Sequence, residues 1–164
     1  MTRLLLPLLL VALVFPVGLA EPASAAQDLQ GMIDSAPSGS VLVLPSGTYD
    51  GGVTIDKPLE IRGEDWPVVD GGGSGTNITI TAPGVTLTGL VIANTGDSLD
   101  RENSGISANA PNVTIIGNRL ENVLFGIFLR RADDSVVSDN TVGAMDVGPA
   151  RRGDGIRLWE SHNV

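Results

Sequence analysis

The stretch GISANAPNVTIIGNRL at residues 105–120 has a cadence that returns twice further along the chain. It recurs as GIFLRRADDSVVSDNTV at 126–142 and begins again as GIRLWESHNV at 155–164. Each copy starts with a small residue and continues with apolar residues at alternate positions, which is typical of short β-strands. Self-similarity at a near-constant period indicates a repeat architecture, in which each repeat is one structural unit.

Aligning the copies on the small residue places apolar side chains in columns. The first column contains Ile78, Ile106, Ile127 and Ile156. Each repeat holds three runs of three to five residues, and no two-residue Asn-Gly or Asp-Gly turn joins them into hairpins. If each repeat is one coil, equivalent residues stack about 4.8 Å apart and bury the Ile and Leu columns. The sequence therefore predicts an all-β protein, a right-handed parallel β-helix.

The two ends of the repeat differ. QDLQGMIDSA at 27–36 places Leu29, Met32 and Ile33 on one helical face, which predicts a helical cap at the N-terminal end. Residues 40–63 then supply first coils that we expect to be less regular. The last coil is unfinished at Val164, so we expect residues 26–164 to be the N-terminal part of a longer β-helix whose C-terminal coils are missing.

The first 25 residues resemble a secretory signal peptide. Arg3 precedes an apolar run from Leu4 to Ala20, and Ala23-Ser24-Ala25 is a small-residue cleavage site. Export with cleavage is therefore expected, and no second apolar run of spanning length follows. A membrane anchor is the alternative, but two prolines interrupt a run that is barely long enough to span.

Composition limits what the exported part can do. The chain has no cysteine, which excludes disulfides and thiolate metal sites, and its net charge is −9. An acidic domain repels phosphate backbones, so nucleic acid is not expected as a partner.

Coil length varies at one corner. The connection between equivalent positions spans 13 residues from Ile92 to Gly105 and again from Val142 to Gly155, but only 6 from Leu120 to Gly126. Two insertions, 95–103 and 143–154, should therefore leave the same edge on either side of a plain coil, with a shallow gap between them. Insertions in repeat proteins often form the binding face, so we expect a partner-docking surface there. Its candidate residues are Asp97, Asp100, Arg101, Glu102, Met145, Asp146, Arg151, Arg152 and Asp154. Two solvated loops without a function are the alternative.

Other polar residues give weaker signals. Asn118 and Asn140 occupy matching corners and should stack as a structural amide ladder. The thioether of Met145, which we expect to be exposed, and His162, the single histidine, are weak candidates for a copper site. The outward columns of the repeat contain no acid: they read Thr79, Ser107, Phe128, Arg157 and Thr81, Asn109, Arg130, Trp159. No pair of catalytic carboxylates can be assembled, so we do not expect an enzyme.

The mature sequence from about residue 38 to 164 resembles the NosD family of nitrous oxide reductase maturation proteins. The more specific segments are GDSLD at 96–100, NVLFGIFL at 122–129 and RRGDGIRLW at 151–159. The resemblance implies a periplasmic accessory protein without known enzymatic activity. It implies work with an ABC-type ATPase and permease, with a copper-carrying lipoprotein and with the reductase, whose copper centres it helps to assemble. Copper would then be in transit and not a bound cofactor. A polysaccharide-binding or polysaccharide-degrading β-helix is the alternative.

Overall fold

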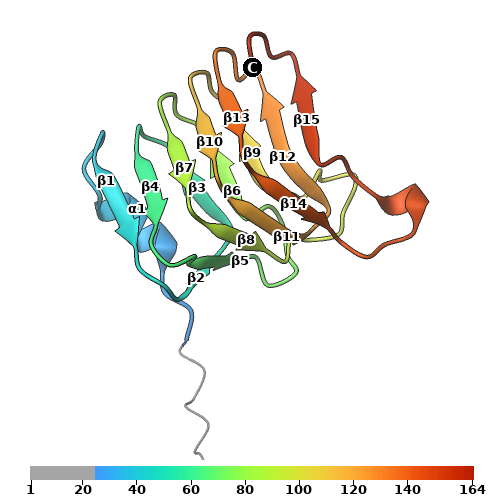
Figure 1. Ribbon diagram of the computed structural model, residues 1–164, viewed down its shortest axis with the longest axis horizontal. Helices are drawn as coiled ribbons and strands as arrows, with labels where there is room; N and C mark the ends of the chain where they lie inside the picture. The colour runs from blue at the N-terminus through green and yellow to red at the C-terminus, as the bar shows by residue number, and fades with distance from the viewer. Residues whose placement is uncertain (1–24) are drawn as a thin grey trace, which may run out of the picture.

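The computed structural model describes residues 25–164, which wind into five successive coils of three strands each (Figure 1). The expected signal peptide lies almost wholly outside the described residues. The helices and strands are α1 (Leu29–Ser35), β1 (Val41–Leu44), β2 (Thr48–Asp50), β3 (Val53–Ile55), β4 (Glu60–Gly63), β5 (Val68–Asp70), β6 (Ile78–Ile80), β7 (Thr86–Thr88), β8 (Val91–Ala93), β9 (Ser104–Ala108), β10 (Thr114–Ile116), β11 (Arg119–Val123), β12 (Phe125–Arg130), β13 (Val136–Ser138), β14 (Thr141–Ala144), the 3-10 helix η1 (Pro149–Arg151) and β15 (Ile156–Trp159).

Every third strand belongs to the same sheet. The first sheet is β1-β4-β7-β10-β13, the second is β2-β5-β8-β11-β14, and the third is β3-β6-β9-β12-β15. All neighbouring strands in these sheets are parallel, and the coils follow one another from the blue end to the red end of Figure 1. The predicted parallel β-helix is confirmed.

The predicted isoleucine column is confirmed residue by residue. Ile78 pairs with Ile106, Ile106 with Ile127, and Ile127 with Ile156, while Val53 extends the column into the first coil. The three inner isoleucines are fully buried, and Ile156 on the last coil is 51% exposed. Such columns remove apolar side chains from water along the whole axis, which is the main stabilising contribution in this narrow core.

The predicted helical cap is also confirmed. Asp28 begins α1, and its carboxylate accepts a hydrogen bond from the Gly31 amide at 2.9 Å, which satisfies an otherwise unpaired donor. Leu29 and Ile33 are buried in the common core, where α1 packs against β2 and β3. The helix ends at Ser35, ahead of Pro37, and covers one end of the coils.

Asparagines stack at the corner between the first and second sheets, as predicted. The Asn140 side-chain oxygen accepts from the Asn118 amide at 2.9 Å, and the Asn118 side-chain oxygen accepts from Leu90 N–H at 3.1 Å. Their side-chain amide groups donate to main-chain carbonyls of the preceding coil, those of Leu87 in β7 and Ile115 in β10. The ladder therefore satisfies buried corner groups and is structural.

The first coil is as regular as the others, so the prediction of irregular first coils was wrong. Strands β1, β2 and β3 pair without a register shift with β4, β5 and β6. Within residues 25–164, no helix combines the length and the hydropathy needed to cross a bilayer.

Candidate docking corner and outer-face groove

The five turns between the second and third sheets differ widely in length. They comprise residues 51–52, 71–77, 94–103, Leu124 alone, and 145–155. The two longest flank the single-residue connection, as the sequence predicted, although Gly143 and Ala144 belong to β14 and not to the second loop. The glycine-rich turn 71–77 is a third excursion that the alignment missed, because the turn ends at Asn77, where the alignment began.

Buried polar side chains fix the ends of the first loop. Thr95 is fully buried, and its hydroxyl accepts from Leu124 N–H at 2.9 Å. Near the other end, the Asn103 side-chain oxygen accepts from Ser98 N–H at 3.1 Å. The charged middle of the loop, which includes Asp97, is thus held on a rigid frame.

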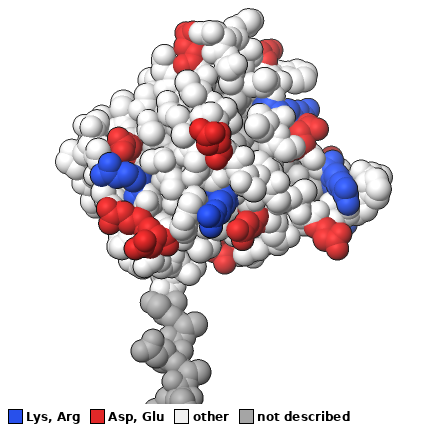
Figure 2. Space-filling model, viewed as in Figure 1, with Lys and Arg blue, Asp and Glu red and all other residues white. Residues whose placement is uncertain are grey.

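One ion pair joins the two loops. Arg151, at the end of η1, contacts Asp97 with 2.7 Å between guanidinium nitrogen and carboxylate oxygen. Arg152 instead donates to the Val147 carbonyl, and neither it nor Asp100 forms an ion pair with the other loop in the described part of the chain. Figure 2 shows basic and acidic groups side by side where loop 145–155 projects, and scattered charges on the rest of that face.

The plain coil between the loops is covered, so the predicted shallow gap was wrong. Leu124 is only 3% exposed. Gly153 lies so close to the Leu124 carbonyl and the Phe125 ring that a Cβ there would clash with both. The Gly153 end of the second loop therefore lies against Leu124 and Phe125, while its middle part around η1 projects from the corner (Figure 1).

Glu102 lies over the outer face of the third sheet, where the sequence showed no acid. Its two carboxylate oxygens contact Arg130 at 2.9 Å and Arg157 at 3.2 Å. Both guanidinium groups lie over the Phe128 ring, at 5.1 and 5.2 Å from its centroid, and cover it to 4% exposure. The outward arginines on adjacent coils were the signal that could have located this acid.

A groove of about 220 Å³ lies beside Glu102 on the same face. Its lining includes outward side chains of β6, β9 and β12, which are Thr79, Ser107, Phe128 and Arg130. Thr81 and Asn109, which follow the ends of β6 and β9, also line it. Thr76, Arg101 and Glu102 complete the lining. The site thus combines two features, the loop pair and this groove, and both include Arg101 and Glu102.

The weak metal candidates lie at different corners. Met145 follows β14 and is half-buried, not exposed as expected, whereas His162 follows β15 at the turn toward the first sheet. No group of three His, Cys, Asp or Glu side chains that could hold a metal occurs in residues 25–164. In the groove, the only carboxylate lining the walls is Glu102, and both its oxygens are held by arginines.

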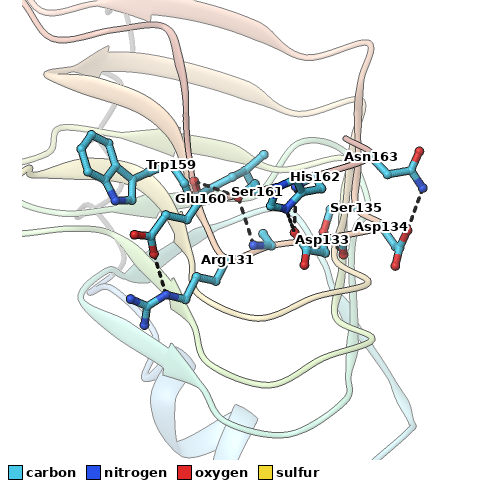
Figure 3. Close-up of polar contacts among 11 residues, drawn as sticks. Arg131, Asp133, Asp134, Ser135, Trp159, Glu160, Ser161, His162 and Asn163 are labelled. Atoms are coloured by element: carbon cyan, nitrogen blue, oxygen red, sulfur yellow. Dashed lines mark hydrogen bonds and ion pairs between the residues drawn. The ribbon is translucent and has the colours of Figure 1, made fainter.

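His162 takes part in a ladder between two stacked turns (Figure 3). Its ring nitrogen lies 3.1 Å from an Asp133 oxygen, which also accepts from the His162 amide at 2.7 Å. The side-chain amide of Asn163 donates to the Asp134 carboxylate at 2.7 Å, and Arg131 pairs with Glu160. These contacts hold consecutive coils in register, which gives His162 a structural role in this corner.

The ladder makes a prediction for the titration of Asp133. Hydrogen bonds from the His162 amide and then from its ring lower the pKa of Asp133 below the usual 3.8. A lowered pKa means that the stabilisation is present above the unfolded-state pKa and is lost as the pH falls through the folded-state value. NMR titration should give a midpoint below 3.8, and His162→Ala should raise it only in part, because the main-chain donor remains. An Asp133 titration midpoint at 3.8 or above in the unsubstituted protein would contradict the hydrogen bonds from His162.

Fold and site together define a class of protein: a parallel β-helix repeat protein with a charged loop pair at one corner. None of the known family models matches the chain, and no solved structure matches it either. Two curated proteins do, both described as probable ABC transporter binding protein NosD.

The relative from Pseudomonas aeruginosa is 34% identical over 146 residues, which are 87% of this chain and 34% of the relative. The relative from Stutzerimonas stutzeri is 33% identical over 119 residues, 71% of this chain and 27% of the relative. The chain is therefore NosD-like over most of its length, as its sequence motifs predicted. It spans about a third or less of the length of these relatives.

Proposed function

We propose that the protein is a non-catalytic accessory factor that binds an ABC-type transporter and assists assembly of the copper centres of nitrous oxide reductase in the periplasm. The description of both relatives as ABC transporter binding proteins supports the first part. The signal-like segment at residues 1–25 supports export. The reductase role follows from the family resemblance of the sequence motifs.

The observation that carries the proposal is the ion-paired loop pair at one corner. Loops 94–103 and 145–155 lie on the same edge and contact each other through Asp97 and Arg151. Asp100, Arg101, Asp146 and Arg152 are exposed on the same two loops, and none of them forms an ion pair within residues 25–164. Polar groups of this kind give specificity and fix the orientation of a docked protein more than they add affinity.

The partners in this proposal are the transporter ATPase and permease, a copper-carrying lipoprotein and the reductase. Copper is the cargo in this proposal. Met145 and His162 remain the thioether and imidazole candidates for transient contact. Neither belongs to a cluster of ligands within the described chain.

Shortening the two loops tests the proposal. We would delete residues 97–101 and 147–152, which keeps the buried Thr95 and Asn103 and removes no inward isoleucine or leucine. The fold should persist, by circular dichroism, while co-purification with the transporter falls at least about tenfold, a loss of about 1.4 kcal/mol. Copper loading of the reductase in cells should fall with it.

The matched control shortens turn 71–77 at the same corner by deleting residues 72–74, where a Cβ at Gly72 or Gly73 would meet nothing. This control should leave co-purification with the transporter and copper loading of the reductase unchanged. If the loop-shortened protein folds, binds the transporter and supports copper loading like the original, the docking surface lies elsewhere.

A further inference from the structure

The groove on the third sheet has a regular floor. Thr79 pairs with Ser107 and Ser107 with Phe128 across adjacent coils, so the hydroxyls form a row perpendicular to the strands. Thr81 and Asn109 follow the ends of β6 and β9 and add a second row. Rows of this kind repeat at the coil spacing of about 4.8 Å.

This lining recognises hydroxyl groups. Threonine and serine hydroxyls each donate and accept a hydrogen bond, and the Asn109 amide can do both at separate atoms. The Phe128 ring is covered by the guanidinium groups of Arg130 and Arg157, so its face is closed to a ligand. A ligand rich in hydroxyls matches the donors and acceptors of the Thr, Ser and Asn side chains.

The groove also has a local positive charge. Arg101 and Arg130 against Glu102 leave one net positive charge among the lining residues, and Arg157 lies beside them, although the whole chain carries −9. Glu102 already contacts Arg130 and Arg157, whereas Arg101 has no ion-pair partner in residues 25–164. Arg101 is thus the group available to a ligand carboxylate, which it can bind with two parallel hydrogen bonds.

We propose that this groove binds an acidic oligosaccharide, with a hexuronate unit on the Thr and Ser rows and its carboxylate on Arg101. The coil spacing is comparable with the length of one pyranose unit, so successive rows can meet successive sugars. An acidic peptide is the competing ligand, but β6, β9 and β12 are each paired on both sides. No free strand edge is therefore available here for a peptide backbone to add to. This inference does not depend on the proposed accessory function.

Calorimetric titration with trigalacturonate, and with maltotriose as the neutral sugar, tests the proposal. We expect the acidic trimer to bind at least about tenfold more tightly than maltotriose at low salt. Arg101→Gln should weaken trigalacturonate about tenfold, and Asn109→Leu should weaken both sugars. The matched control is Arg62→Gln, which removes one exposed arginine from the first sheet and should change nothing.

Absence of trigalacturonate binding at millimolar concentration would overturn the proposal, and so would equal affinity for maltotriose. Triglutamate provides the peptide arm: binding as tight as that of trigalacturonate would assign the groove to acidic peptides instead. Arg151→Gln, which breaks the contact between the loops but lies outside the groove, should leave sugar affinity unchanged. Loss of sugar binding in that variant would mean that the loop pair and not the groove holds the sugar.

Discussion

Replacing Ile106 by alanine is expected to lower the free energy of unfolding by about 2–5 kcal/mol. Ile106 is fully buried at the centre of the column, between Ile78 and Ile127 on the adjacent coils. Truncation removes three methyl or methylene groups and leaves a cavity that the paired strands on both sides cannot close by moving together. Urea unfolding followed by far-UV circular dichroism would measure the change.

The matched control is Ile156→Ala, the same substitution in the same column. Ile156 is 51% exposed in this chain and contacts a coil on one side only, at Ile127. Its truncation should cost less than about 1 kcal/mol. Equal losses at the two positions would mean that the column is not a continuous core.

Replacing Gly126 by alanine is expected to be the most disruptive change of a single methyl group, costing about 3 kcal/mol or more. A Cβ on Gly126 would lie inside the contact distance of the Gly155 carbonyl oxygen and also meet Val142. That carbonyl accepts a hydrogen bond from Ile127 N–H at 3.0 Å, so it cannot withdraw without breaking the stack of β12 on β15. Thermal unfolding of the variant would show the loss as a lower Tm.

Gly155 provides the control, because it precedes the strand at the equivalent position one coil later. A Cβ there would meet nothing within 4 Å, and its φ is not positive. Gly155→Ala should therefore leave stability unchanged within about 0.5 kcal/mol, or raise it slightly by restricting the unfolded chain. If both variants unfold alike, close packing at this corner is not the reason for glycine at position 126.

The stacked columns of strand residues could be predicted from the sequence because the repeat fixes which residues become neighbours in the structure. In a parallel stack, residues with the same position in successive repeats become neighbours, so Ile78, Ile106 and Ile127 could be aligned by counting. The same holds for Asn118 and Asn140, whose amides bond across one coil. The corner that carries the two insertions could also be predicted, by counting the residues between equivalent positions of successive coils.

The paths of the loops could not be predicted, because no period constrains them. Glu102 reaches the outer face of the third sheet through contacts with Arg130 and Arg157, which are 28 and 55 residues away in sequence. The expectation of an acid-free face counted strand positions only and so missed it. Leu124 is likewise covered by Gly153, which belongs to another coil. The alternation of apolar and polar residues within one repeat carries no information about such a contact.

The unequal turns between the second and third sheets have an evolutionary consequence. Single-residue and eleven-residue connections, Leu124 and 145–155, join the same two sheets, and the strands after both, β12 and β15, stay in register. Insertions and deletions at this corner therefore leave the same strand residues facing the core. A one-residue insertion or deletion inside a strand would instead turn the following side chains of that strand to the opposite face. Length polymorphism among descendants should accumulate at this corner first, and new specificities can arise there while the ancestral core sequence is retained.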